Sequence, residues 1–183
     1  ACGDAHAAAI KTDGTLWTWG YNANGQLGTT NNNSSPVQTT ALGNTWKQVT
    51  GGSSTTAAIK TDGTLWTWGY NNYGQLGDNT ITDKNSPVQT TTFNTNWKQV
   101  TCGGTQTAAI KTDGTLWTWG YNNYGNLGLG NRTYYSSPKQ VGALTTWLSV
   151  SGGSYHTLAI KTDGSLWAWG YNTYGGLGLG TRT

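Results

Sequence analysis

The sequence contains no Glu and no Met, and charged residues make up only 9% of its 183 residues. All seven acidic residues are therefore Asp, and four of them stand in Asp-Gly pairs, where a role in turns accounts for them. The other three, Asp4, Asp78 and Asp83, lack the spacing of a paired-carboxylate site or of a calcium-binding loop. We therefore expect no catalytic residues and no enzymatic activity. The absence of an initiator Met favours a segment of a longer chain.

Long apolar runs are also missing from the sequence. No stretch approaches the ~20 apolar residues that a membrane-spanning helix needs, so we expect no membrane insertion. Helix-favouring residues are scarce, whereas the chain holds 28 Gly, 11 Trp and 10 Tyr. This composition favours strands and turns, and the aromatic residues supply enough apolar surface for a packed core. We expect an all-β fold with almost no helix.

An internal repeat organises the chain. The string AIKTDGTLWTWGYN begins at Ala9, Ala58 and Ala109, and it returns at Ala159 with two substitutions, which gives steps of 49, 51 and 50 residues. A period near 50 is typical of one four-stranded blade of a propeller. We expect a single repeat domain of four units, at approximately residues 1–45, 46–96, 97–146 and 147–183.

Each unit contains the pattern of a β-hairpin. In the first unit, Asp13-Gly14 separates the segments 9–12 and 15–19, which predicts a two-residue type I′ turn. Residues alternate between the two faces of a strand, so both Trp side chains of the segment 15–19 point the same way. We expect these Trp residues and their equivalents in the other units to lie in the core.

Each hairpin is followed by an Asn- and Gly-rich loop and by further strands. The loops start at Tyr21, Tyr70, Tyr121 and Tyr171, and their composition predicts ordered turns. Short strands containing Pro follow at Ser35–Gln38, Ser86–Gln89 and Ser137–Gln140, and Pro favours the edge of a sheet. Strands led by Trp follow at Trp46–Val49, Trp97–Val100 and Trp147–Val150. Paired glycines after these strands predict a close approach of backbones near a central axis.

The Gly-Gly pairs, the Ala-Ile-Lys-Thr-Asp-Gly and Leu-Trp-Thr-Trp-Gly segments, and the core formed by Trp68-Gly69, Asn71 and Gly74–Gly77 recur along essentially the whole chain. This repeat resembles that of the RCC1 (regulator of chromosome condensation) family. The resemblance implies blades of a seven-bladed β-propeller, which needs roughly twice this length. Three arrangements stay open: part of a larger propeller, a half-ring completed by self-association with a second copy, or an open stack of units.

The few Cys and His residues occupy equivalent repeat positions. Cys2 and Cys102 stand two units apart, beyond the ~7 Å between Cα atoms that a disulfide spans, so we expect free, buried thiols. For His6 and His156 we expect hydrogen bonds to neighbouring backbone. A zinc site using Cys2 and His6 would need two more ligands that the sequence does not offer. We therefore expect no metal and no cofactor.

The formal net charge of +3 is spread along the chain. A nucleic-acid-binding surface would be more strongly charged and more clustered, so we expect no nucleic-acid partner. Tyrosines in loops provide rigid contact surfaces with a polar tip, and the loops are the segments that differ most between units. The candidate binding residues in these loops are Tyr73, Tyr124, Arg132, Tyr134, Tyr135 and Tyr174.

These observations favour a non-enzymatic scaffold that binds a protein or glycan ligand or serves as a structural protein. Uniform, weakly charged repeats are similar to RCC1-like proteins of bacteria and phages, which implies an extracellular, cell-surface or virion-associated setting with an adhesion or tail role. The alternative implied by the resemblance is guanine-nucleotide exchange on a small GTPase through an inserted wedge, but no insertion here resembles one. A third reading, photoreception, involves a Gly-Trp-Arg-His-Thr motif in a plant relative, and the matching segment 153–157 lacks its Trp and Arg.

Overall fold

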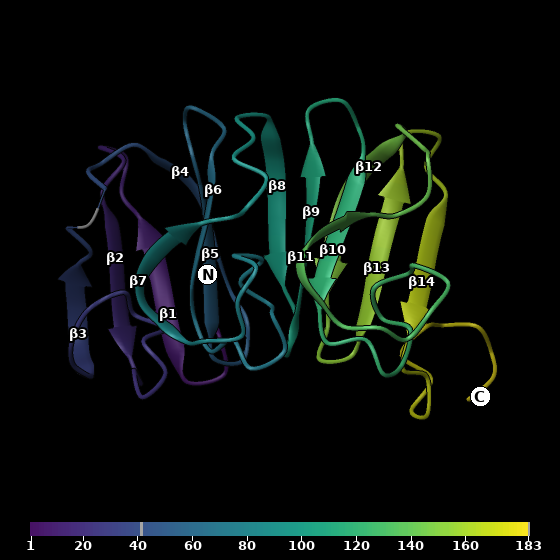
Figure 1. Ribbon diagram of the computed structural model, residues 1–183, viewed down its shortest axis with the longest axis horizontal. Helices are drawn as coiled ribbons and strands as arrows, with labels where there is room; N and C mark the ends of the chain where they lie inside the picture. Colours follow the sequence, from purple (N-terminus) through teal and green to yellow (C-terminus); the bar gives the residue numbers. More distant parts are fainter. Residues whose placement is uncertain (41, 183) are drawn as a thin grey trace.

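The computed structural model describes residues 1–40 and 42–182, and this part of the chain contains fourteen strands and no helix. The strands form four antiparallel sheets that follow one another along the long axis of the molecule (Figure 1). Sheet 1 contains β1 (His6–Ile10), β2 (Leu16–Gly20) and β3 (Asn33–Gln38). Sheet 2 contains β4 (Trp46–Gly51), β5 (Thr55–Lys60), β6 (Leu65–Gly69) and β7 (Lys84–Gln89).

Sheet 3 contains β8 (Trp97–Cys102), β9 (Gln106–Lys111), β10 (Leu116–Gly120) and β11 (Tyr135–Gln140). Sheet 4 contains β12 (Trp147–Gly152), β13 (His156–Lys161) and β14 (Leu166–Gly170). The all-β fold and its propeller-type blades are therefore confirmed. In every sheet, strands that are consecutive in the chain are neighbours, so each sheet is a simple meander.

The outer strands β3, β7 and β11 each lie at a sheet edge, as Pro in these segments predicted. The Trp-led strands β4, β8 and β12 lie at the opposite edge of their sheets and form the contacts between sheets. Strand β8, for example, contacts β4 and β5 of sheet 2 as well as β12 of sheet 4. The repeat therefore places equivalent loops of successive units next to one another.

The hairpin turn differs from the predicted type I′ turn. Ile10 pairs with Leu16, and the Gly14 amide donates to the Lys11 carbonyl at 2.9 Å. Only Gly14 takes a positive φ, of 79°, whereas a type I′ turn needs two such residues. Asp13 instead accepts hydrogen bonds from the amide and hydroxyl of Thr15 at 2.9 and 2.6 Å. This side-chain contact stabilises a longer turn, which the Asp-Gly pair alone did not distinguish.

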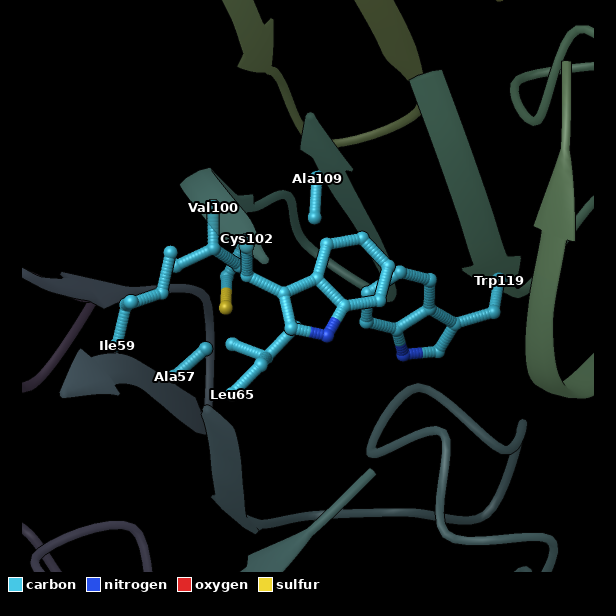
Figure 2. Close-up of a cluster of buried hydrophobic side chains, with 8 residues drawn as sticks. Ala57, Ile59, Leu65, Val100, Cys102, Ala109 and Trp119 are labelled. Carbon is cyan, nitrogen blue, oxygen red and sulfur yellow. The ribbon is translucent and has the colours of Figure 1, made fainter. Parts of the chain in front are cut away.

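The core lies between neighbouring sheets. Figure 2 shows Ile59 and Leu65 of sheet 2 packed with Val100 and Cys102 of β8 and with Trp119 of β10. Burying one Trp removes about 150–250 Å² from water, or roughly 4–6 kcal/mol of gross hydrophobic free energy. The largest apolar contribution therefore belongs to the interfaces between sheets rather than to any single sheet.

The two Trp residues of each hairpin do not share one environment. The second is fully buried in sheets 2 and 3, where it is Trp68 and Trp119, as expected for the core, but Trp19 and Trp169 in sheets 1 and 4 are only half-buried. The first is half-buried in sheet 3, where the Lys111 ammonium lies 4.0 Å from the ring centre of Trp117 in a cation–π contact. In sheet 4 the prediction is wrong, because Trp167 is 49% exposed on β14, an edge strand without the outer neighbour that β11 provides for β10 in sheet 3.

Glycines allow the inner ends of the sheets to approach closely. A Cβ added to Gly52 would lie 2.4 Å from the carbonyl oxygen of Gly103, and one added to Gly103 would lie 2.4 Å from that of Gly153. Contacts this short exclude any side chain at these positions. The close backbone approach predicted from the Gly-Gly pairs is thus confirmed.

Candidate binding face

The loop that follows each hairpin is held by a buried Asn. In unit 2 the side-chain oxygen of Asn71 accepts a hydrogen bond from the Leu76 amide at 2.9 Å. Its side-chain nitrogen donates to the Thr80 carbonyl at 3.1 Å. Equivalent contacts hold the loops of units 1 and 3, through Asn22 and Asn122. The ordered turns predicted for these loops are therefore present, and the Tyr residues beside the Asn have defined positions.

Hydrogen bonds between units fix these loops against the next sheet. The Gln75 carbonyl of unit 2 accepts from the Thr107 hydroxyl at 2.7 Å and from the Trp119 indole at 2.9 Å, both in unit 3. The Asn126 carbonyl of unit 3 accepts in the same way from Thr157 and Trp169 of unit 4. The loops of units 2 and 3 are therefore each positioned by two neighbouring units.

Seven tyrosines from these loops and Tyr155 from the turn between β12 and β13 form a continuous cluster, which we call the tyrosine ladder. Successive rings are in contact through edge-to-face or tilted pairs, with centroid separations from 4.6 to 6.3 Å. Such pairs contribute roughly 0.5–1.5 kcal/mol beyond the burial of apolar area. The members are Tyr70, Tyr73, Tyr121, Tyr124, Tyr134, Tyr155, Tyr171 and Tyr174.

The centre of the tyrosine ladder joins units 2 and 3. The Tyr73 ring lies 5.0 Å from that of Tyr121 and 5.7 Å from that of Tyr134, and Tyr121 lies 4.9 Å from Tyr134. Tyr124 extends the cluster to unit 4, with its ring 4.6 Å from that of Tyr171. Because each ring is held by others, the face offers aromatic surface that is already ordered.

Parts of the ladder remain open to solvent. Tyr174 is 86% exposed, and Tyr124, Tyr134 and Tyr155 are 41%, 38% and 38% exposed. These rings can therefore contact a ligand while their inner edges rest on neighbouring rings. Unit 1 lacks this surface, because Asn24 stands where the other units have the second loop Tyr.

The phenol groups of the ladder raise one another's pKa values. The Tyr70 phenol is the main cause of the raised pKa of Tyr73, and Tyr121 has the same effect on Tyr124, because two neighbouring phenolates would repel each other. Burial is the main cause of the raised pKa of Tyr134. The hydroxyls of Tyr73, Tyr124 and Tyr134 therefore stay neutral at physiological pH and can act as hydrogen-bond donors and acceptors.

The structure brings together four of the six candidate binding residues, Tyr73, Tyr124, Tyr134 and Tyr174. Tyr135 lies apart from them at the start of β11, where it packs against the core and accepts a hydrogen bond from Asn131 at 3.2 Å. Arg132 is exposed in the preceding loop and forms no ion pair with the described residues.

Four ladder residues are not among the sequence-based candidates. Three of them directly follow a Trp-Gly pair and stand three residues before the next loop Tyr: Tyr70, Tyr121 and Tyr171. This recurring position is a signal in the sequence that could have identified them. Tyr155 offers no such signal. Its equivalents in the other units are Ala5, Ser54 and Thr105, and only the fold places it beside Tyr124.

His6, Cys2 and Cys102 are not part of the ladder. The Nε2 atom of His6 is 2.8 Å from the Thr56 hydroxyl, so its partner is a side chain and not the predicted backbone group. Cys102 is buried and free, as expected. Cys2 is free but exposed, because no sheet in the described part of the chain covers it as sheet 2 covers Cys102.

Within residues 1–40 and 42–182, no three His, Cys, Asp or Glu side chains gather closely enough to hold a metal ion. The same residues include no helix with the length and apolar character needed to cross a membrane.

Comparison with known proteins identifies relatives of this arrangement. The chain is 38% identical to the ultraviolet-B receptor UVR8 of Arabidopsis thaliana over 141 residues, which is 77% of this chain and 21% of that protein. It is 33% identical over 150 residues to the E3 ubiquitin-protein ligase HERC2 of Homo sapiens, which is 79% of this chain and 3% of HERC2. The chain therefore spans only 21% and 3% of the length of these two relatives.

Solved structures show the same fold. Human WBSCR16 superposes with a TM-score of 0.85 at 29% identity, covering 99% of this chain and 49% of that one. Yeast RCC1 (Prp20), solved bound to Kap60, also gives a TM-score of 0.85, at 20% identity and covering 97% of this chain and 44% of that one. The RCC1-like domain profile matches residues 1–183. Together with the four blade-like sheets and the Trp-led strands β4, β8 and β12, this match shows that the chain belongs to the RCC1-like domain family.

Proposed function

We propose that this domain is a non-enzymatic scaffold that binds protein partners through the tyrosine ladder. One observation carries the proposal: three consecutive units place aromatic rings on a single face and hold them against one another. Tyrosines lose little conformational entropy on binding and combine apolar area with a polar tip. Rings that are already ordered have still less entropy to lose.

The charge of the face supports a particular kind of contact. The ladder contains no charged side chain, and the raised pKa values of Tyr73, Tyr124 and Tyr134 keep these phenols neutral. Binding should therefore depend on apolar area and hydrogen bonds and only weakly on salt, unlike the recognition of nucleic acid. Two solved yeast structures also support protein binding as a use of this fold: RCC1 (Prp20) was solved bound to Kap60, and Prp20p is described by its binding to Gsp1p and histones.

The test is a selection of protein and peptide ligands on the intact domain, followed by affinity measurements with variants. Tyr121→Ala and Tyr134→Ala remove rings from the centre of the ladder. Tyr21→Ala is the matched control, because Tyr21 occupies the same repeat position as Tyr121, is 49% exposed and belongs to unit 1, outside the ladder.

We expect the two ladder variants to weaken binding of the selected ligands by about 30-fold or more, the loss typical of removing a central aromatic contact. The control should leave affinity within a factor of about two. Ligands that bind all three variants as tightly as the wild type would contradict the proposal. Binding of glycans with no binding of proteins would contradict it as well.

Guanine-nucleotide exchange is the alternative function, and no contact in the described residues favours it. An exchange assay on a panel of small GTPases separates the two functions, because a scaffold should leave the rate of nucleotide release unchanged. Accelerated release would refute the scaffold proposal. The extracellular or virion-associated setting stays a prediction that rests on the resemblance to RCC1-like proteins of bacteria and phages.

A further inference from the structure

A polar cleft of about 270 Å³ separates the loops of units 1 and 2. Among the described residues that line it, Asp83 is the only charged one and none is aromatic. A cleft of this size suits a single side chain rather than a drug-sized ligand, for which ~300–1,000 Å³ is usual. The chief lining residues are Asn22, Asn24, Thr29, Thr30, Asp83 and Asn85.

The cleft occupies the place of an aromatic contact in the next junction along the chain. Asn24 stands at the repeat position of Tyr73. Asp83 stands at that of Tyr134, because each directly precedes the strand residue that pairs with the Gly of a Trp-Gly pair. The rings of Tyr73 and Tyr134 lie 5.7 Å apart, whereas the Asn24 side chain donates a hydrogen bond to the Asp83 carboxylate at 3.2 Å. Two smaller polar side chains thus leave a space where two rings would otherwise meet.

Flanking units leave this part of a junction open. Both walls of the cleft belong to units 1 and 2. In the equivalent junction of units 2 and 3, Tyr134 remains 38% exposed although unit 1 lies before that junction and unit 4 after it. The access to Asp83 is therefore set by the two units that form the cleft.

The Asp83 carboxylate is held in place and has no counter-ion. Its Oδ1 atom accepts a hydrogen bond from the Asn71 amide at 2.8 Å, and its Oδ2 atom accepts the bond from Asn24. It is half-buried and forms no ion pair within residues 1–40 and 42–182, since Lys84, the next residue, pairs with Asp78 at 3.4 Å. A carboxylate that is partly withdrawn from water attracts a cation more strongly than one that is fully exposed.

The other lining side chains favour one kind of cation. Thr30 and Asn85 are exposed, and neither side chain forms a hydrogen bond with the described residues. Their oxygens and the Oδ1 atom of Asn24 surround the carboxylate with further acceptors. A guanidinium group has five N–H donors in a plane, whereas an ammonium group has three. The lack of an aromatic wall removes the surface on which a sugar ring would stack.

We propose that this cleft binds the guanidinium group of an arginine side chain of the protein partner. The proposal rests on the proposed function, since it names a residue of the partner that binds the tyrosine ladder. The two surfaces are continuous, because Asn71, whose amide holds the Asp83 carboxylate, directly follows Tyr70 of the ladder. The partner segment places apolar residues on the rings of units 2 and 3 and its arginine beside Asp83.

The test is an NMR titration of the intact, isotopically labelled chain with N-acetyl-arginine methylamide. The ligand control is N-acetyl-citrulline methylamide, which has nearly the same shape and no charge. The side-chain amide signals of Asn24 and Asn85 report binding at the cleft, because both residues line it.

Asp83→Asn removes the charge and keeps the loop. Asn32 stands at this position in unit 1, and its side chain accepts the equivalent hydrogen bond from the Asn22 amide at 2.7 Å. Asn24→Tyr restores the residue of the other three units and should fill the space. Asp4→Asn is the matched control, since it removes one carboxylate that does not line the cleft. Thermal unfolding checks that each variant is folded.

We expect saturable shifts with the arginine probe and an affinity that Asp83→Asn and Asn24→Tyr each lower about tenfold or more, through loss of charge-assisted hydrogen bonds or of space. Asp4→Asn should leave the affinity within a factor of about two. No saturable shift, equal shifts with the citrulline probe, or an equal loss in Asp4→Asn would each overturn the proposal. If Asn24→Tyr does not fold, Asp83→Asn alone decides.

The outcomes also separate this proposal from the proposed function. If the arginine probe fails while selected protein ligands still depend on Tyr121 and Tyr134, only the arginine site is refuted. If the selected ligands depend on neither Tyr, the proposed function is refuted, whatever the probe shows.

Discussion

The strongest test of how the units hold together is the removal of a glutamine contact between sheets 3 and 4. The Gln99 side chain donates to the Val150 carbonyl and accepts from the Val150 amide, each at 3.1 Å. Val150 is only 4% exposed, so water does not readily replace these bonds. Gln48 makes the same pair of contacts with Val100 between sheets 2 and 3.

Gln99→Ser is the informative change, because Ser149 naturally stands at this position in unit 4. Two hydrogen bonds at about 0.5–1.5 kcal/mol each give an expected loss of about 1–3 kcal/mol. In a domain of this size 1 kcal/mol lowers Tm by about 2–4 °C, so a loss of 2 kcal/mol corresponds to about 4–8 °C. Thermal unfolding followed by Trp fluorescence measures the change.

Ser149→Gln is the matched control. It installs the longer side chain where no further inner strand lies beside β12 in the described residues, so stability should change by less than about 0.5 kcal/mol. The reasoning fails if Gln99→Ser costs less than about 0.5 kcal/mol or no more than the control. In repeat proteins stability is close to a sum of unit and interface contributions. Gln99→Ser should therefore also broaden the unfolding transition, because it weakens only one interface.

Three further predictions concern thiols, acid and mass. Burial raises the pKa of Cys102 to about 12, so an aromatic disulfide reagent should modify the exposed Cys2 in the native protein and reach Cys102 only on unfolding; rapid modification of both would contradict this. Hydrogen bonds from Thr64 lower the pKa of Asp62, so its stabilising effect is full above the unfolded value of ~3.9 and is lost as pH falls through the folded value. Asp62→Asn should reduce the fall in urea-measured stability below pH 4, and an unchanged fall would refute the role. Sheet 1 has no Trp-led inner strand among the described residues, so sheet 1 of a second copy would not cover Leu166 as Trp147 covers Leu116; light scattering should therefore show no discrete closed dimer.

Much of the fold follows from local rules that the sequence displays directly. The alternation of residues within the hairpins, Pro in the outer strands and Gly-Gly beside the inner ends each constrain one strand or one contact. These rules predicted which strands lie at the edges and where backbones approach. They predicted the wrong turn at Asp13-Gly14, because the Asp13 carboxylate accepts hydrogen bonds from both the amide and the hydroxyl of Thr15, and these bonds stabilise a longer turn.

The binding face was only partly predictable, since it depends on which loops become neighbours. Loop position alone identified Tyr73, Tyr124, Tyr134 and Tyr174. The same rule selected Tyr135, which follows Tyr134 in the sequence. Tyr135 is the first residue of β11, and its side chain lies on the face of the strand that packs against the core. Tyr155 escaped prediction because its role depends on contact with a ring 31 positions away.

Identical residues in this chain have different environments, and the difference shows where stability originates. Leu65 and Leu116 are fully buried, whereas Leu166, at the same position of the same hairpin, is 66% exposed. The pairing with the preceding strand is equivalent in the three cases, whereas in the described residues the third lacks both an outer strand and the next sheet, whose Trp147 packs on Leu116. Burial is therefore a property of the interface between units and not of the unit.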